Sequence, residues 1–120
     1  MPGPSPYRQG FGRTPAPVFD VAISWQGQRR VLEALVDSGA SGTIVPESLA
    51  LDLNLRKIGE RTISGYDHRP ERRSQYAVDI DFLGLLLRNF PVVAVPNRTY
   101  ALIGRDILNR YVTTLDGPRL

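Results

Sequence analysis

The residues of this sequence best suited to do chemistry are Asp37-Ser38-Gly39-Ala40. They follow the apolar residues 34–36 directly, and the motif occurs once in the 120-residue chain. A strand that ends in Asp-Ser-Gly can present a carboxylate on a tight backbone turn, as acid-base hydrolysis of a peptide bond requires. That chemistry needs two carboxylates, and one chain supplies one. We therefore expect a catalytic form to be a dimer in which two Asp37 side chains meet on a two-fold axis.

A second motif, Ala101-Leu102-Ile103-Gly104-Arg105-Asp106-Ile107-Leu108, follows near the end of the chain. The two motifs in this order resemble the retroviral-like (retropepsin-type) aspartic proteases, and the resemblance covers about residues 18 to 117. It implies an all-β fold, a closed acid-protease-type barrel with one or two short helices. It also implies a single lobe that forms a homodimer.

The resemblance assigns roles to the first motif by position. Asp37 takes the place of the catalytic aspartate. Ser38 takes the place of the family's Thr or Ser, whose hydroxyl crosses the dimer axis to bond the other chain's backbone. Gly39 lets the substrate backbone approach closely, because it has no Cβ. Ala40 completes this active-site loop and dimer contact.

The second motif supplies the residues that the resemblance places beneath the site: Ile103 and Gly104 against the loop, Arg105 and Asp106 at the start of the C-terminal helix. Viral members often carry an acidic residue shortly after the first motif, and it pairs with the arginine of the second. This chain has Ser41 and Gly42 there, so Arg105 must find another partner. Without the resemblance, Gly104 would be explained by a tight bend. For Arg105 and Asp106 the alternatives are an ordinary helix start and a role in stabilising the dimer.

The flap that folds over bound peptide in this family is matched in placement by Ser64, Gly65, Tyr66 and Asp67. The alternative is that Tyr66 is simply an exposed loop aromatic.

The first motif also has an alternative interpretation. Asp37 to Gly39 taken alone would be a plain Asx-type turn between strands.

Hydrophobic periodicity predicts the elements that must position these motifs. We expect strands at 18–25, 31–36, 43–45, 76–82, 85–89, 91–95, 100–103 and, closing the chain, 111–115. Short helices are expected at 46–53 and 105–110. Residues 60–75 carry glycine, proline and clustered charge, so they are expected to form a long exposed hairpin tip.

Composition suggests two segments. Residues 1–17 hold five of the ten prolines and few aliphatic side chains, and we expect them to be a flexible N-terminal segment. Residues 18–120 then form one protease-like domain. The sequence shows neither an apolar leader nor a stretch of membrane-spanning length, so we expect a soluble, cytoplasmic protein with no membrane partner.

No cofactor and no metal are expected. The chain has no cysteine, which excludes thiolate zinc sites and thiol nucleophiles. Asp79 and Asp81 share one strand face, but no further ligand accompanies them, so we expect a solvated face rather than a metal site. His68, the single histidine, lies among charged and turn residues, and we expect it to have no metal-binding or catalytic role.

Arginine dominates the charge, with a formal net charge of +3. A nucleic-acid binder is therefore a rival interpretation, but the densest cluster, Arg69, Arg72 and Arg73, lacks the interleaved aromatic residues that would stack bases. We expect no nucleic-acid partner.

The function predicted from the sequence is a homodimeric aspartic endopeptidase that acts on extended peptides with apolar side chains near the cleaved bond. Its partners are a second copy of itself and a peptide or protein substrate. The alternative is a catalytically silent module that keeps the fold for dimerisation or peptide binding.

Overall fold

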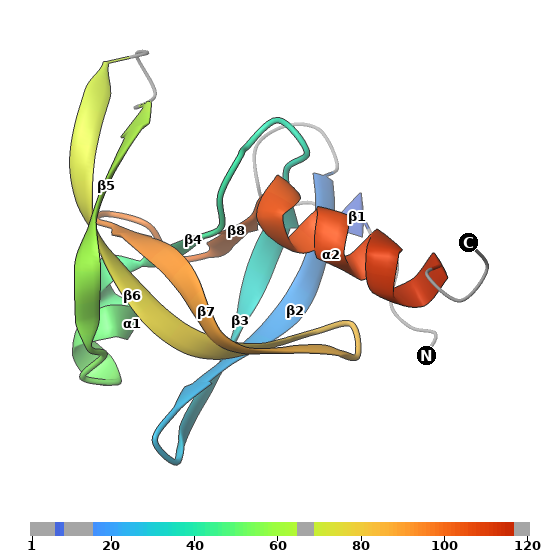
Figure 1. Cartoon of the computed structure of the whole chain (residues 1–120), viewed down its shortest axis with the longest axis horizontal. Coiled ribbons are helices and arrows are strands. Elements are labelled where there is room, and N and C mark those ends of the chain that lie inside the picture. Colours follow the sequence, from blue (N-terminus) through green and yellow to red (C-terminus); the bar gives the residue numbers. More distant parts are fainter. Residues whose placement is uncertain (1–6, 9–15, 65–68, 117–120) are drawn as a thin grey trace.

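The computed structural model describes residues 7–8, 16–64 and 69–116. Strands and helices follow one another in the order β1 (Tyr7–Arg8), β2 (Ala16–Trp25), β3 (Gln28–Val36), β4 (Ile44–Pro46), α1 (Glu47–Asp52), β5 (Lys57–Ser64), β6 (Pro70–Phe82), β7 (Leu85–Val95), β8 (Ala101–Ile103) and α2 (Arg105–Asp116) (Figure 1).

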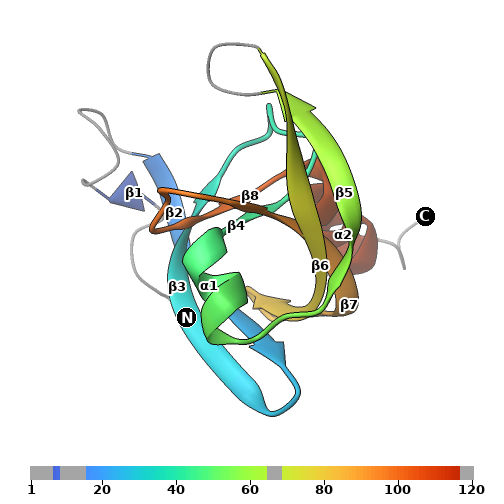
Figure 2. The same ribbon diagram turned by 90° about the vertical axis from the view of Figure 1, so that its left-hand side faces the viewer.

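Six of these strands close into a barrel. The pairing order is β2, β3, β8, β4, β7 and β6, and β6 pairs back to β2 through Val21 to Ser24. Figure 2 looks into the resulting ring, with α1 beside its opening. Strands β1 and β5 extend the sheet outside the closed ring. The expected all-β closed barrel with short helices is confirmed.

Parallel pairing between β3 and β8 brings the two sequence motifs together. Val36, the last residue of β3, lies opposite Ile103, the last residue of β8. Because parallel strands run in the same direction, the residues that follow them, Asp37 and Gly104, leave the sheet at the same edge. The barrel therefore joins the two motifs although most of the domain separates them in sequence.

Tight two-residue turns end two of the hairpins. Gln26 and Gly27 have φ angles of 50° and 84°, and Leu83 and Gly84 have the same pair of values. Positive φ at both central residues is the signature of the type I′ turn, whose twist matches that of paired strands. The first turn joins β2 to β3, and the second joins β6 to β7.

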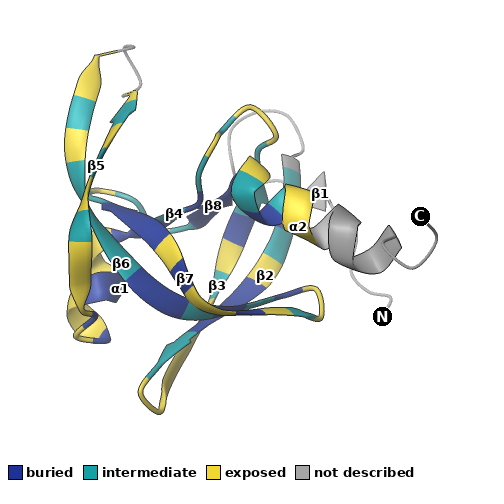
Figure 3. Ribbon diagram, viewed as in Figure 1, coloured by how far each residue is buried: buried dark blue, intermediate teal, exposed yellow. Residues whose placement is uncertain are grey.

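The core lies inside the barrel, as the band of buried residues in Figure 3 shows. The rings of Phe19 and Phe82 form a T-shaped pair with 6.0 Å between their centroids. Helix α1 adds Leu49 and Ala50 to this core, and α2 adds Ile107. The largest fully buried side chains are Phe82, Ile23, Leu53, Ile80, Ile103, Ile107, Val18, Val21, Val45, Val78, Val92 and Val93.

The predicted terminal strand at 111–115 is wrong, because α2 continues through these residues to Asp116. The β-branched residues 112–114 favour a strand locally. Apolar residues at 107, 108, 111 and 115 nevertheless have helical spacing, and the helix is already under way when the chain reaches them. The amide of Leu108 donates to the Gly104 carbonyl at 3.1 Å, which closes the first turn.

Residues 60–75 belong to an exposed hairpin, as predicted, but most of them are strand rather than tip, because β5 and β6 are paired from Lys57 and Tyr76 to Ser64 and Pro70. Strand β5 was missed because it is exposed or half-buried along its whole length and has no apolar face.

Residues 85–89 and 91–95 form one strand, β7, rather than two. Asn89 has a φ of 54° at the register irregularity, and its amide donates to Asp79 Oδ1 at 2.8 Å. A side chain thus replaces one ladder bond and lets the strand continue.

Within 1–17, Tyr7–Arg8 pairs with Ala16 and Pro17. The other residues up to position 15 lie outside the described residues, so the flexibility expected for this segment stays a prediction.

Candidate active site

The Asp37 backbone is fixed where β3 ends. Its amide donates to the Ile103 carbonyl at 3.0 Å, and its carbonyl accepts the Ala40 amide at 3.1 Å, which closes a tight turn. Asp37 is half-buried as a residue, and its carboxylate accepts the Gly39 amide on Oδ1 at 2.9 Å in an exposed hydrogen bond. A Cβ at Gly39 would lie 3.2 Å from that oxygen. Glycine thus keeps the surroundings of the carboxylate open.

The second motif lies directly beneath this loop. Gly104 is buried, and a Cβ there would lie 2.6 Å from the Gly42 carbonyl oxygen and 3.0 Å from that of Ala40. The Arg105 amide donates to the Ala40 carbonyl at 2.8 Å. Such close backbone packing excludes any side chain at position 104 without movement of the loop.

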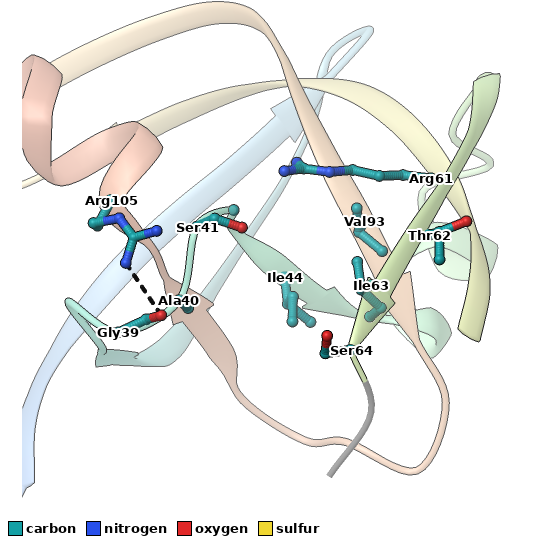
Figure 4. Close-up of a pocket in the computed structure, with 11 residues that line it drawn as sticks. Gly39, Ala40, Ser41, Ile44, Arg61, Thr62, Ile63, Ser64, Val93 and Arg105 are labelled. Carbon is teal, nitrogen blue, oxygen red and sulfur yellow. Dashed lines mark hydrogen bonds between the residues drawn. The ribbon is translucent and has the colours of Figure 1, made fainter. Parts of the chain in front are cut away.

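Arg105 finds its partners on the loop itself. Its Nη1 donates to the carbonyls of Ser38 at 3.1 Å and Gly39 at 3.2 Å (Figure 4). In the absence of the acidic residue that many viral members carry, the guanidinium bonds loop carbonyls and still ties the two motifs together.

A second connection depends on Thr43, which sequence reasoning treated only as part of a short strand. Thr43 is buried, and its hydroxyl donates to Asp106 Oδ1 at 2.7 Å while its amide donates to Oδ2 at 3.1 Å. The same hydroxyl accepts the Gly104 amide at 3.2 Å. Asp106 Oδ1 also accepts the Ile107 amide at 2.8 Å, so the carboxylate bonds one of the amides in the first turn of α2. The one signal in the sequence was a polar side chain at the start of an apolar strand.

A cavity of about 370 Å³ separates the loop from the β5–β6 hairpin. Its lining comprises Gly39, Ala40, Ser41, Gly42, Ile44, Arg61, Thr62, Ile63, Ser64, Val93 and Arg105. Figure 4 shows the loop on one side and β5 on the other, with Ile44, Ile63 and Val93 between them. The site therefore combines a carboxylate-bearing loop with an adjoining space of side-chain size.

Of the flap candidates, Ser64 ends β5 and lines this cavity. Gly65, Tyr66 and Asp67 lie outside the described residues. The β5–β6 hairpin that carries them projects from the barrel, in yellow and green at the upper left of Figure 1.

Charged residues elsewhere on the hairpin are paired. Arg72 donates to Glu60 at 2.9 Å and Arg73 to Glu71 at 3.0 Å.

Over the described ranges, no group of three or more His, Asp or Glu side chains is arranged to hold a metal ion. In the same part of the chain, no helix has the length and hydropathy needed to cross a membrane.

A closed six-stranded barrel, with an Asp-Ser-Gly loop packed on a Gly-Arg-Asp motif, defines a retropepsin-like aspartic protease fold. Residues 21–107 match the family model described as Aspartyl protease, and the chain belongs to that family. Among curated protein sequences, no match to this chain is found.

Solved structures show the same fold. EIAV protease, complexed with the inhibitor HBY-793, is 23% identical with a TM-score of 0.63, and the match covers 80% of this chain and 88% of that one. Simian Foamy Virus (mac) protease is 24% identical with a TM-score of 0.57, covering 79% and 94%. A retropepsin-like aspartic protease from Rickettsia conorii is 15% identical with a TM-score of 0.57, covering 82% and 73%. At these identities the likeness is one of fold.

Proposed function

We propose that this protein is a homodimeric aspartic endopeptidase in which each chain contributes Asp37. The observation that carries the proposal is the position of Asp37: its backbone is bonded to Ile103 and Ala40, its carboxylate accepts the Gly39 amide, and it begins the loop that lines the cavity. Membership of the aspartyl protease family supports the same chemistry. Because one chain has one such loop, the second carboxyl comes from a second copy across a two-fold axis. Ser38, at the exposed turn, is the proposed contact between the two loops.

Two carboxyl groups held about 3 Å apart share one proton, because both cannot ionise cheaply, and the pair titrates with two separated apparent values. The ionised member draws a proton from water, while the protonated member polarises the scissile carbonyl. Gly39 and Ala40 leave room for the extended substrate backbone beside the carboxylates. The hairpin that ends at Ser64, with Gly65, Tyr66 and Asp67 as the proposed flap, closes over the peptide and excludes bulk water.

Replacement of Asp37 by Asn tests this proposal, because it removes both carboxyl groups from the dimer while keeping their shape. We expect digestion of a diverse peptide pool, read by mass spectrometry, to fall at least about a thousandfold. The parent should show a bell-shaped pH profile, as expected of a shared-proton pair. Asp52→Asn, at an exposed position at the end of α1, is the control and should keep parent activity.

Two results contradict the proposal. One is undiminished cleavage by Asp37→Asn. The other is saturable peptide binding by the parent without turnover at any pH from acid to neutral, which is the behaviour of a catalytically silent module.

A further inference from the structure

Arg61 is the charged side chain that reaches from the hairpin into the cavity. It is half-buried on β5, and a Cβ at Gly42 would lie 2.6 Å from its Nη1 and 3.3 Å from its Cζ. The guanidinium therefore lies against the backbone of the active-site loop. Figure 4 shows the side chain extended across the space between β5 and that loop.

This guanidinium makes no hydrogen bond or ion pair with any described residue. The acidic residue next to it, Glu60, points to the other face of the strand, as alternation along β5 requires. There Glu60 is already bonded by Lys57 at 3.1 Å and Arg72 at 2.9 Å. A half-buried arginine is thus left with its donors directed into the cavity.

The rest of the lining reinforces this positive potential. Arg105 is a second cation, but its Nη1 is bonded to loop carbonyls. Among the described residues, the lining contains no carboxylate, and its uncharged side chains are hydroxyl-bearing or apolar. A guanidinium beside apolar Ile44 and Val93 binds a carboxylate more strongly than it would in water, because two parallel N–H···O bonds form in a partly desolvated place.

We propose that Arg61 determines specificity: the cavity binds an Asp or Glu side chain of the peptide substrate close to the cleaved bond. This inference rests on the proposed peptidase function. The methylene groups of a Glu side chain cover Ile44 and Val93, and its carboxylate pairs with Arg61. A volume of about 370 Å³ is ample for one such side chain. The subsite thus adds a charged requirement to the apolar contacts expected near the scissile bond.

The first test compares kcat/KM for peptides that differ only by Glu or Gln, with the substitution moved through each position around the cleaved bond. At one position the parent should prefer Glu by about tenfold or more, the range of a charge-assisted hydrogen bond. Arg61→Gln should lose that preference, Arg61→Lys should keep part of it, and Arg61→Glu should favour Lys instead. Arg72→Gln removes the same charge from the hairpin outside the cavity and should keep the parent preference.

Equal cleavage of every Glu and Gln pair by the parent would overturn the inference while leaving the peptidase proposal intact. Retention of the preference by Arg61→Gln would overturn it as well. Because Arg61 has no hydrogen bond or ion pair to lose within the described part of the chain, thermal melts of the variants should match the parent, and a loss of preference is then not a folding effect.

A binding measurement separates this inference from the proposed function. Immobilised Asp37→Asn protein is incubated with a random peptide pool, and the retained peptides are sequenced by mass spectrometry. Enrichment of Asp and Glu that disappears in the Asp37→Asn, Arg61→Gln double variant supports the Arg61 subsite even if the parent cleaves nothing. Retention without acidic enrichment counts against it even if the parent is an active peptidase. The enrichment should weaken in 1 M salt, where the Debye length is about 3 Å.

Discussion

On one side of the cavity, residues 39–42 rest on buried Gly104 and are linked to the barrel through Thr43, Asp106 and Arg105. On the other side, no residue of β5 is buried; beyond its ladder with β6, the strand has surface ion pairs at Glu60 and the contact of Arg61 with the loop. Figure 3 shows the same contrast between the dark barrel and the yellow and teal hairpin.

The contrast fits the two tasks that the proposed function gives these walls. In the proposed dimer, a carboxylate that meets its twin on an axis needs a fixed backbone, which buried packing and charged hydrogen bonds supply. A wall that admits a peptide and then closes, as proposed for the hairpin, needs low local stability, and few buried contacts provide that. Buried packing is concentrated on the loop side of the cavity, and the hairpin has little of it.

Glycine substitutions should show the largest difference between the two walls. In Gly104→Ala the new Cβ meets backbone atoms of Gly42 and Ala40, which cannot move without shifting the loop. We expect a loss of roughly 2–3 kcal/mol in the free energy of unfolding, measured by urea denaturation at fixed protein concentration.

The matched control is Gly59→Ala on β5, where the nearest atom to a new Cβ is Gln75 Oε1 at 4.0 Å. We expect a change within about 0.5 kcal/mol. Equal losses at the two glycines would mean that the walls do not differ in packing.

The bond between Thr43 and Asp106 should give the next largest effect. Thr43→Val keeps the shape but leaves Asp106 Oδ1 and the Gly104 amide each without one partner in a buried place. We expect a loss of about 1–3 kcal/mol. A double-mutant cycle with Asp106→Asn should give a coupling of at least about 0.5 kcal/mol.

Thr62→Val, at an exposed position on β5, is the corresponding change on the hairpin and should alter stability by less than about 0.5 kcal/mol. Additive effects of Thr43→Val and Asp106→Asn would show that the bond does not link the two motifs.

Much of this arrangement could be predicted from the sequence because it is local. Alternating apolar residues predict most of the barrel strands, and an apolar run before Asp37 predicts a strand that ends at a carboxylate. The Thr43 to Asp106 bond joins residues 63 positions apart, and nothing local indicates it. The carbonyl partners of Arg105 were hidden for the same reason, since backbone atoms carry no sequence signal.

The hairpin was harder to predict for a different reason. Strand β5 is held by its ladder with β6 and not by an apolar face, so its sequence lacks the hydrophobic alternation that predicts a strand. In the sequence, Arg61 is indistinguishable from a surface arginine paired with the neighbouring Glu60. The structure shows that the two side chains lie on opposite faces of β5. Charge pairing across a sheet is a property of register, and register requires the structure.

Glu60→Gln, on the hairpin, should change the stability of the fold least among the substitutions that compare the two walls of the cavity. The hydrogen bond from Arg72, and then that from Lys57, hold the pKa of Glu60 below its ordinary 4.5. A group with a lowered folded-state pKa stabilises the fold above its unfolded pKa, and that contribution is lost as the pH falls through the folded value. Because these charges are solvated, we expect a drop in Tm of at most about 3 °C at pH 7, and none in acid below the folded pKa.

Melting curves of Glu60→Gln and the parent at both pH values check this, with Asp52→Asn as an exposed carboxylate outside the hairpin. If Glu60→Gln lowered the Tm at pH 7 as much as Thr43→Val does in the same measurement, the ion pairs of the hairpin would contribute substantially to the stability of the fold. The hairpin would then be a second rigid wall, and substrate entry would need another moving part. A small effect instead means that the ion pairs of β5 orient side chains more than they hold the strand down. Glu60 then matters chiefly because its charge is satisfied on the outer face, which leaves Arg61 to act alone on the inner one.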